Sequence, residues 1–260
     1  MELVRGGSLQ DYLKKNAGKI NDTERLNNMA SSAACGLAYL HSRSCIHRDI
    51  AARNCLYDKN KNVKISDFGL SREGEKYKMT QTQRVPIKWI APECLINFTF
   101  TRSSDVFSFG VLLWEIFSDA AEPFEGKKTT EIKNLILNGV RLEFPAATPL
   151  EIKEMVTQHL WSSRPEDRYT MSDVVQRLEQ MTGVKQPTKK KDHHKSRNEP
   201  NDENVYRDSG ARRKSRREED KGQSIAKKKG GNSTSKYRSI SHSTSTVNST
   251  VQNGSPEKEL

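Results

Sequence analysis

Three short motifs, in a fixed order and at fixed spacing, constrain this chain of 260 residues more than any other feature. The first reads His-Arg-Asp-Ile-Ala-Ala-Arg-Asn over residues 47–54, and the second, Asp67-Phe68-Gly69, begins thirteen residues after Asn54. The third is Ala91-Pro92-Glu93. A single triplet is easily found by chance in a chain of this length, whereas all three in this order are not. They therefore indicate one fold that gathers them around a common site.

The residue types in these motifs suit the transfer of a phosphoryl group from ATP to a hydroxyl group. A carboxylate, here Asp49, can orient the attacking hydroxyl and accept its proton. An amide and a second carboxylate, here Asn54 and Asp67, can hold the Mg²⁺ ions that offset the charge of the β- and γ-phosphates. The sequence therefore predicts Asp49 as the base, Asn54 and Asp67 as metal ligands, and ATP and Mg²⁺ as cofactors.

The motifs resemble those of protein kinases, and two further features resemble tyrosine kinases in particular. Serine/threonine kinases usually place a Lys two residues after the catalytic Asp, whereas here Arg53 lies four residues after Asp49. In that position Arg53 would neutralise charge at the γ-phosphate. The string Pro86-Ile-Lys88-Trp89 resembles the substrate platform that receives the long phenolic side chain. The resemblance thus implies transfer to tyrosine in protein substrates.

The same resemblance implies roles for residues around the motifs. Asp105 would accept backbone N–H bonds from the catalytic loop, with a simple helix N-cap as the alternative. Glu93 would pair with Arg168 and fix the end of the activation segment. His47 and Phe68 are expected to have structural roles at the site.

The nucleotide pocket is expected near the beginning of the chain. Residues 1–4 resemble the hinge between the two lobes of a tyrosine kinase, so the backbone of Glu2 and Val4 would contact the adenine edge, with Leu56 as the floor. Met1 would be the gatekeeper residue if the chain continues upstream. The 46 residues before His47 contain no Gly-rich loop, β3 Lys or αC Glu, which a complete kinase domain has. We therefore expect the hinge and the C-terminal lobe, without the N-terminal lobe.

Tyr77 is the one tyrosine between the second and third motifs and is predicted to be a regulatory phosphorylation site. A phosphate adds about −1.5 to −2 of charge and three acceptor oxygens. Arg48 is the expected partner of that phosphate, with Arg72 and Arg84 as helpers, and pairing would order the loop. The alternative is an ordinary surface tyrosine in a polar loop.

The globular part is predicted to be mainly α-helical, resembling helices D to I of a kinase C-terminal lobe with short strands around the catalytic loop. Ser8 begins a capping box for a short helix, and Asp22 or Thr23 can cap the next one. Apolar residues lie nearly all round the helix over 106–117, so we expect it to be central. Strand pieces are expected at 45–46, 55–57 and 63–65, and further helices at 131–137, 149–161 and 171–181.

The composition changes at residue 185. Residues 186–260 carry 18 Lys and Arg against 10 Asp and Glu, a net charge of +8, and show no apolar periodicity. Such a segment has too little apolar surface to offset the entropy lost on ordering. We therefore expect two parts: a kinase domain over 1–184, truncated at its N-terminus, and a basic, Ser/Thr-rich disordered tail over 185–260.

Two basic clusters in the tail, residues 212–217 and 227–229, allow several interpretations. They would suit an anionic membrane surface or a nuclear-import receptor, and a solvated tail is the alternative. Nucleic acid is the weaker interpretation, because no aromatic residues interleave to stack on bases. No apolar run is long enough to span a bilayer, and the four cysteines form no Cys-x-x-Cys pair. The expected location is the cytoplasm, with the nucleus as the alternative if the basic tail acts as an import signal.

Within the family, residues 1–8 and 66–72 are most similar to the Fes/Fer group of non-receptor tyrosine kinases, whose members carry an SH2 domain upstream. Three positions depart from the family pattern and concern packing: Phe107 for Trp, Tyr169 for Pro and Met171 for Phe.

Two functions stay open. One is a protein-tyrosine kinase whose N-terminal lobe and SH2 domain lie in a longer chain. The other is a catalytically inactive lobe that serves as an interaction or scaffold protein.

Overall fold

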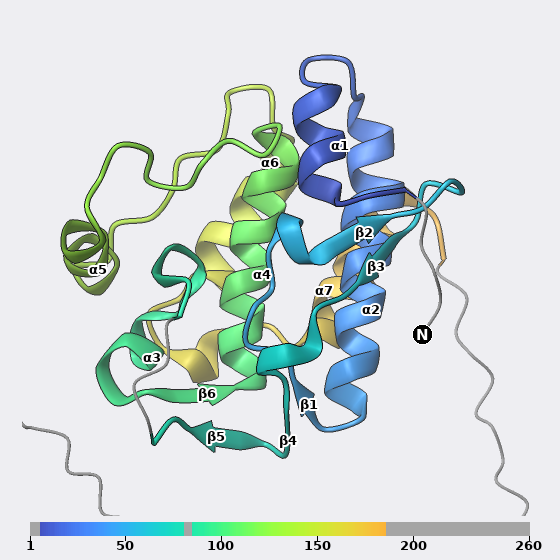
Figure 1. Ribbon diagram of the computed structural model, residues 1–260. Helices are drawn as coiled ribbons and strands as arrows, with labels where there is room; N and C mark the ends of the chain where they lie inside the picture. The colour runs from blue at the N-terminus through green and yellow to red at the C-terminus, as the bar shows by residue number, and fades with distance from the viewer. Residues whose placement is uncertain (1–5, 81–84, 186–260) are drawn as a thin grey trace, which may run out of the picture. The chain divides into compact units, whose positions relative to one another are not determined.

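The computed structural model describes residues 6–80 and 85–185 (Figure 1). The chain divides into two units, residues 1–194 and 195–260, and every described residue belongs to the first unit. The expectations for Met1, Glu2, Val4 and Arg84, and those for the tail from residue 186 onward, lie outside the described residues.

Helix α4 (Arg102–Phe117) lies at the centre of the first unit (Figure 1). Residues 104–117 are all buried, because apolar side chains point in every direction and each face must be covered by another element. A central helix over 106–117 is thus confirmed, although a capping box at Thr101 starts the helix earlier than predicted. The elements that contact α4 include η1 (Glu24–Ala30), β6 (Thr99–Thr101) and η5 (Met155–Leu160).

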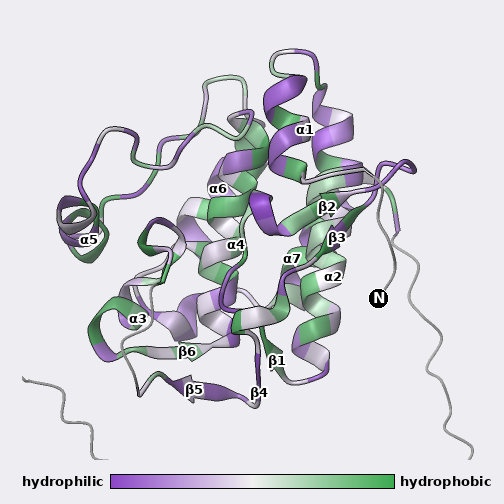
Figure 2. Cartoon of the chain, in the orientation of Figure 1, coloured by the Kyte–Doolittle hydropathy of each residue, from purple (hydrophilic) through white to green (hydrophobic). Residues whose placement is uncertain are grey.

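The first helix begins where the sequence indicates. Ser8 is the N-cap of α1 (Leu9–Lys15), and its side chain accepts the backbone N–H of Asp11 at 3.1 Å. Two leucines, Leu9 and Leu13, bury the inner face of this helix. The outer face of α1 is polar (Figure 2).

The next helix starts differently from the prediction. The π-helical segment η1 runs directly into α2 (Ser31–Ser42), and neither Asp22 nor Thr23 caps it. Instead the side chain of Asn21 accepts the backbone N–H of Glu24 at 2.8 Å. The backbone at Thr23 is already helical, with φ −60° and ψ −45°, so the capping acceptor must come from a residue before it.

Within the described ranges 6–80 and 85–185, six short strands form three antiparallel pairs (Figure 1). The predicted pieces at 45–46, 55–57 and 63–65 are confirmed, whereas the strands after residue 70 were not predicted. The pairs are β1 (Cys45–Ile46) with β4 (Arg72–Glu73), β2 (Cys55–Tyr57) with β3 (Val63–Ile65), and β5 (Lys76–Lys78) with β6. Figure 2 shows β5 as a hydrophilic strand, and its position depends on pairing with β6 and on the half-buried ring of Tyr77 at its centre.

The remaining helices complete a mainly α-helical unit. The short helix α3 (Pro92–Asn97), which was not predicted, has Pro92 at its first position, where proline is favourable. Helix α7 (Met171–Thr182) packs against α2 (Figure 1), and a capping box at Thr170 begins it. The other C-terminal helices are α5 (Thr129–Leu137) and α6 (Leu150–Glu154), which continues into the π-helical η5. Single 3₁₀ turns are η2 (Ala52–Asn54), η3 (Phe68–Leu70), η4 (Ile87–Trp89) and η6 (Pro165–Asp167).

The three residues that depart from the kinase pattern lie in this helical packing. Phe107 is buried, with the guanidinium of Arg168 5.2 Å from its ring centroid. The ring of Tyr169 stacks on His159 at 4.0 Å, and Met171 is buried at the start of α7. Within residues 6–80 and 85–185, no helix has the length and apolar character needed to cross a membrane.

Candidate active site

The catalytic loop is held by one carboxylate from the central helix. Asp105 on α4 is 1% exposed and accepts two consecutive backbone N–H groups, from His47 at 2.7 Å and from Arg48 at 2.8 Å. Its Oδ2 also lies 3.1 Å from Nε2 of His41 on α2. The N-cap of α4 is Thr101, so Asp105 does not cap this helix. Asp105 therefore ties the loop that carries Asp49 to both α4 and α2.

His47 connects the first motif to the second. The imidazole is fully buried, and burial lowers its pKa, which favours the neutral ring. One ring nitrogen, Nε2, lies 3.1 Å from the carbonyl oxygen of Ser66 and donates to it, and Nδ1 accepts the backbone N–H of Asp49 at 3.3 Å. The ring of Phe68 meets that of His47 edge-on at 5.3 Å. The segment on both sides of Asp67 is thereby fixed against the catalytic loop.

The carboxylate of Asp49 is paired with Arg53 in the same loop. The side-chain amide of Asn54 donates to the backbone carbonyl of Asp49 at 2.9 Å. This bond fixes which end of the amide is the nitrogen, so the amide oxygen is directed to the other side. Asp67 is solvent-exposed, has a left-handed backbone with φ 59°, and accepts the N–H of Gly69 at 3.3 Å. The negative charges of Asp49 and Asp67 both raise the pKa of His47, against the larger effect of burial.

Two of these side chains suit a magnesium ion bound together with a nucleotide. Mg²⁺ is usually bound through one or two protein oxygen ligands, with phosphate oxygens and waters as the rest. The amide oxygen of Asn54 and the exposed carboxylate of Asp67 offer two such ligands. In the described part of the chain, no three His, Cys, Asp or Glu side chains gather into a closed metal site. The donor set therefore fits a metal that arrives with its phosphates rather than a structural metal.

The predicted substrate platform lies next to the catalytic loop. Trp89 in η4 places its ring under Arg53, whose guanidinium carbon is 4.3 Å from the ring centroid. Lys88 pairs with Glu122 at the surface. Pro86 and Lys88 also line a cavity of about 270 Å³, which extends to Thr129 and Ile132 near the start of α5. Arg53 thus contacts both the carboxylate of Asp49 and the platform.

The predicted regulatory tyrosine already lies on its expected partner. Tyr77 is paired with Phe100 across β5 and β6. The guanidinium carbon of Arg48 is 4.3 Å from the centroid of the Tyr77 ring and 4.5 Å from that of Phe100. Arg72 approaches the same tyrosine at 5.2 Å. Two cations therefore lie close to the tyrosine before any phosphate is present.

The third motif is attached to the C-terminal helices by an ion pair. Arg168, whose side chain is 0% exposed, donates to both carboxylate oxygens of Glu93 at 2.7 Å. It also donates to the backbone carbonyls of Ser103 and Ser162 at 2.9 and 3.0 Å. The start of α3 is thereby fixed to α4 and to the segment before α7.

Of the residues expected at the nucleotide pocket, the structure describes only Leu56. It is half-buried in β2, and its backbone forms an antiparallel bridge with Ser8. Glu2 and Val4, the residues expected at the edge of this pocket, lie outside the described residues.

Sequence reasoning missed Glu115, a buried residue of this site, as well as His41, the partner of Asp105 on α2. Glu115 lies near the end of α4, is 2% exposed, and accepts hydrogen bonds from the catalytic loop and from Trp89. The sequence did contain an indication of Glu115. A glutamate flanked by Leu, Trp, Ile and Phe in the most apolar helix needs buried hydrogen-bond donors.

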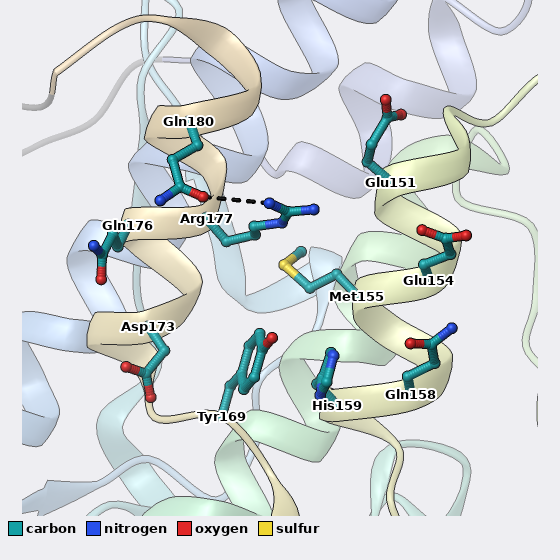
Figure 3. A pocket seen from close by; sticks show the side chains of 10 residues that line it. All are labelled: Glu151, Glu154, Met155, Gln158, His159, Tyr169, Asp173, Gln176, Arg177 and Gln180. Atoms are coloured by element: carbon teal, nitrogen blue, oxygen red, sulfur yellow. Dashed lines mark hydrogen bonds between the residues drawn. The ribbon is translucent and has the colours of Figure 1, made fainter.

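A separate cavity of about 550 Å³ lies between the helical segment α6–η5 and α7 (Figure 3). Its lining is polar and shares no residue with the catalytic loop. The side chains of Met155, His159 and Tyr169 lie between the two helices, and Arg177 donates to Gln180 at 3.3 Å. The other lining residues are Glu151, Glu154, Gln158, Asp173 and Gln176. This cavity is therefore distinct from the site built by the three motifs.

Comparison with known proteins shows the family of this chain. The family model of protein tyrosine and serine/threonine kinases matches residues 1–178. Fer-related kinase 1 of Caenorhabditis elegans is 41% identical over 179 residues, which cover 68% of this chain and 45% of that protein. Tyrosine-protein kinase Fer of Homo sapiens is 38% identical over 180 residues, covering 68% of this chain and 22% of that protein.

The tyrosine-protein kinase transforming protein Fps of Fujinami sarcoma virus is 40% identical over 181 residues, covering 68% of this chain and 20% of that protein. The chain therefore spans less than half the length of these three relatives. The match includes all three motifs and the helices that hold them. This chain belongs to the protein tyrosine and serine/threonine kinase family, and its kinase sequence is of the Fes/Fer type.

Proposed function

We propose that residues 1–184 are the hinge and C-terminal lobe of a protein-tyrosine kinase, which transfers the γ-phosphoryl group of ATP to tyrosine in protein substrates. The observation that carries this proposal is the arrangement around His47. The neutral ring binds the backbone of Asp49 on one side and the carbonyl before Asp67 on the other. It therefore supports a base and a metal ligand in one rigid assembly.

The arrangement suggests how each side chain acts. Asp49 would orient the substrate hydroxyl and accept its proton, because it is the partly buried carboxylate of the loop. Arg53 lies against Asp49 and would stabilise the negative charge of the transferred phosphoryl group. Since Arg53 also stacks on Trp89, the group that stabilises charge is tied to the surface expected to receive the substrate tyrosine.

We propose ATP with Mg²⁺ as the cofactor, held by the amide oxygen of Asn54 and the carboxylate of Asp67. When bound, the metal would supply positive charge to the phosphates. Leu56 would lie under the adenine, with Glu2 and Val4 at its edge. In this proposal the phosphate-covering loop and the N-terminal lobe belong to a longer chain, together with an SH2 domain like that of the Fes/Fer group.

Regulation is proposed to act through Tyr77. A phosphate at this position would replace a ring–cation contact with a charge pair to Arg48, with Arg72 as a second cation nearby. Because Arg48 directly precedes Asp49, this pair would couple the activation segment to the base.

The proposed location is the cytoplasm. All four cysteines, Cys35, Cys45, Cys55 and Cys94, are free thiols, which agrees with a reducing compartment. The basic tail is proposed to be a separate segment that contacts an anionic membrane or an import receptor. An inactive scaffold is the less favoured function, because the base, the charge-stabilising Arg and both metal ligands are all present.

The test is a comparison of two aspartate variants in the complete natural protein. Asp49→Asn removes the base and is expected to lower phosphoryl transfer to a tyrosine peptide by about 100-fold or more. Asp22→Asn makes the same change at an exposed position and should leave the rate unchanged. Transfer that survives in Asp49→Asn, or that prefers a serine peptide to a tyrosine peptide, would contradict the proposal.

A further inference from the structure

Glu115 is a buried acidic side chain to which the reaction as described gives no role. It lies on α4, 2% exposed, among residues that are almost all apolar. A buried carboxylate is retained in a folded protein only where donors satisfy it. The donors of Glu115 come from two parts of the site that are distant in sequence.

One oxygen of Glu115 accepts both bonds. The backbone N–H of Ala52 donates to Oε2 at 2.9 Å, and the indole Nε1–H of Trp89 donates to the same atom at 3.0 Å. Ala52 lies in the catalytic loop between Asp49 and Asn54, whereas Trp89 belongs to the expected substrate platform. Oε2 is therefore the point at which these two segments meet.

The contact continues from Trp89 to the base. The ring of Trp89 lies 4.3 Å under the guanidinium of Arg53, and Arg53 pairs with the carboxylate of Asp49. The orientation of the indole is thus fixed at its nitrogen by Glu115 and on its face by Arg53. A rotation of this ring would move the cation that accompanies the base.

We infer that Glu115 is a positioning residue that holds the substrate platform and the catalytic loop in register through a single carboxylate oxygen. It acts through Trp89 and Ala52, the two residues that donate hydrogen bonds to it. This inference rests on the proposed kinase function for its consequence in catalysis, but the contact itself is independent of that function.

The protonation of Glu115 gives a readout that simple packing would not give. Burial raises its pKa to about 7, against the opposing effect of its bonds to Ala52 and Trp89. The charges that face it are those of Arg53, which lowers the pKa, and Asp49, which raises it, and the buried thiol of Cys55 also lies within its field. An ionised carboxylate accepts hydrogen bonds more strongly than a neutral acid. We therefore expect the platform to be held more firmly at pH 8 than at pH 6.

The direct test is the indole N–H signal of each tryptophan, recorded by NMR across pH 5.5–8.5 in the ¹⁵N-labelled complete protein and assigned with Trp89→Phe. The Trp89 signal should titrate with a midpoint near pH 7 and should stop titrating in Glu115→Gln. Two tryptophans serve as internal controls. The indoles of Trp114 and Trp161 donate to backbone carbonyls, at 2.8 and 3.2 Å, and these acceptors do not titrate.

The catalytic test compares Glu115→Gln with wild type. Gln retains the shape of the neutral acid, so its kcat/KM for a tyrosine peptide should equal that of wild type at pH 6 and be about tenfold lower at pH 8. KM for ATP should stay within about twofold, because Glu115 supports the platform rather than the metal ligands. Glu154→Gln, at an exposed position on α6, makes the same change as a control and should match wild type throughout.

The outcomes separate this inference from the proposed function. A Trp89 signal that titrates identically in Glu115→Gln, or a variant as active as wild type at pH 8, would overturn it. A wild-type protein without any phosphoryl transfer would instead overturn the proposed function and the catalytic consequence drawn from it. The indole titration would then still decide whether Glu115 holds Trp89.

Discussion

Asp105 accepts the backbone N–H of Arg48 at 2.8 Å, and Arg48 has a left-handed backbone with φ 72°. This conformation is unfavourable for a residue with a Cβ, by about 1–3 kcal/mol. The chain adopts it here because the left-handed turn presents two consecutive N–H groups to one buried carboxylate. The carboxylate thus compensates for the strain of the loop that carries Asp49, the proposed base.

Substitution of Asp105 by Asn is therefore expected to destabilise the protein. Asn has one acceptor oxygen in place of two, so at least one of the N–H groups of His47 and Arg48 would be buried without a partner. Such a loss costs about 1–3 kcal/mol, which chemical denaturation in urea would detect. Asp22→Asn, at an exposed position, is the matched control and should not change the midpoint. An Asp105→Asn protein as stable as wild type would show that water satisfies the loop instead.

The ion pair between Glu93 and Arg168 leads to a second prediction. The side chain of Arg168 is fully buried, so Arg168→Met would leave the carboxylate of Glu93 without its partner. Removal of one member of a buried pair costs about 3–5 kcal/mol, whereas replacement of both members is often nearly neutral. The double variant Glu93→Gln/Arg168→Met should therefore be more stable than Arg168→Met alone. Urea denaturation of wild type, Glu93→Gln, Arg168→Met and the double variant tests this prediction. If the free-energy losses of the two single variants simply add in the double variant, a direct pair is contradicted.

The local elements of the fold were largely predictable from sequence. The cap at Ser8 and the strands β2 and β3 follow from residues adjacent in the chain. Helix α4 was predictable because a run that is apolar on every side has to be central. The strands β4, β5 and β6 were not predicted, because each belongs to a pair whose two strands are distant in sequence, whereas β2 and β3 pair with each other across a short polar turn.

Glu115 shows the same limit of prediction from sequence within the candidate site. Its donors lie 63 and 26 residues away in sequence, and only the fold brings them to one oxygen. The residues of the three motifs could be proposed as catalytic from sequence, because their order and spacing are themselves informative. A supporting residue such as Glu115 belongs to no motif. A single acidic residue in an apolar helix indicates that it has buried partners, but it does not indicate which residues these are.

The contact between Tyr77 and Arg48 leads to a third prediction, which separates the packing role of this tyrosine from its chemical role. Tyr77→Phe keeps the ring against Arg48, so the free energy of unfolding should change by less than about 0.5 kcal/mol. Tyr77→Ala removes the ring–cation contact and should cost about 0.5–2 kcal/mol. Neither variant can accept a phosphate at this position. Preincubation with ATP and Mg²⁺ should therefore increase the tyrosine-kinase rate of wild type and leave that of Tyr77→Phe unchanged.

A Tyr77→Phe protein that is activated as strongly as wild type would contradict this prediction. Tyr39, an exposed tyrosine on α2, provides the matched control. Tyr39→Phe removes a hydroxyl outside the activation segment, so preincubation should activate it as it does wild type. Intact mass of the preincubated proteins would show whether one phosphate fewer is incorporated in Tyr77→Phe.

The burial of Glu115 leads to a fourth prediction, which concerns how the stability of the protein depends on pH. Its pKa is raised from 4.5 to about 7 by burial, so between these values the folded state binds a proton that the unfolded state has released. The stabilising contribution is fully present below pH 4.5 and is lost as the pH rises through 7. A pKa difference of one unit corresponds to about 1.36 kcal/mol. The free energy of unfolding at pH 8, where Glu115 is ionised, is therefore lower by about 3 kcal/mol than with a neutral Glu115.

Glu115→Gln, which stays neutral, should therefore be more stable than wild type at pH 8, and this advantage should shrink towards pH 5. Urea denaturation of both proteins at several pH values measures the difference, and other titrating groups cancel because both proteins contain them. A difference that is constant with pH, or that favours wild type at pH 8, would contradict the prediction. Glu115→Gln is also expected to have a lower kcat/KM at pH 8, so at this pH the variant would be more stable and less active than wild type. That combination is expected if the buried charge is retained because it holds Trp89 and Ala52 in place, at the expense of the stability of the folded chain.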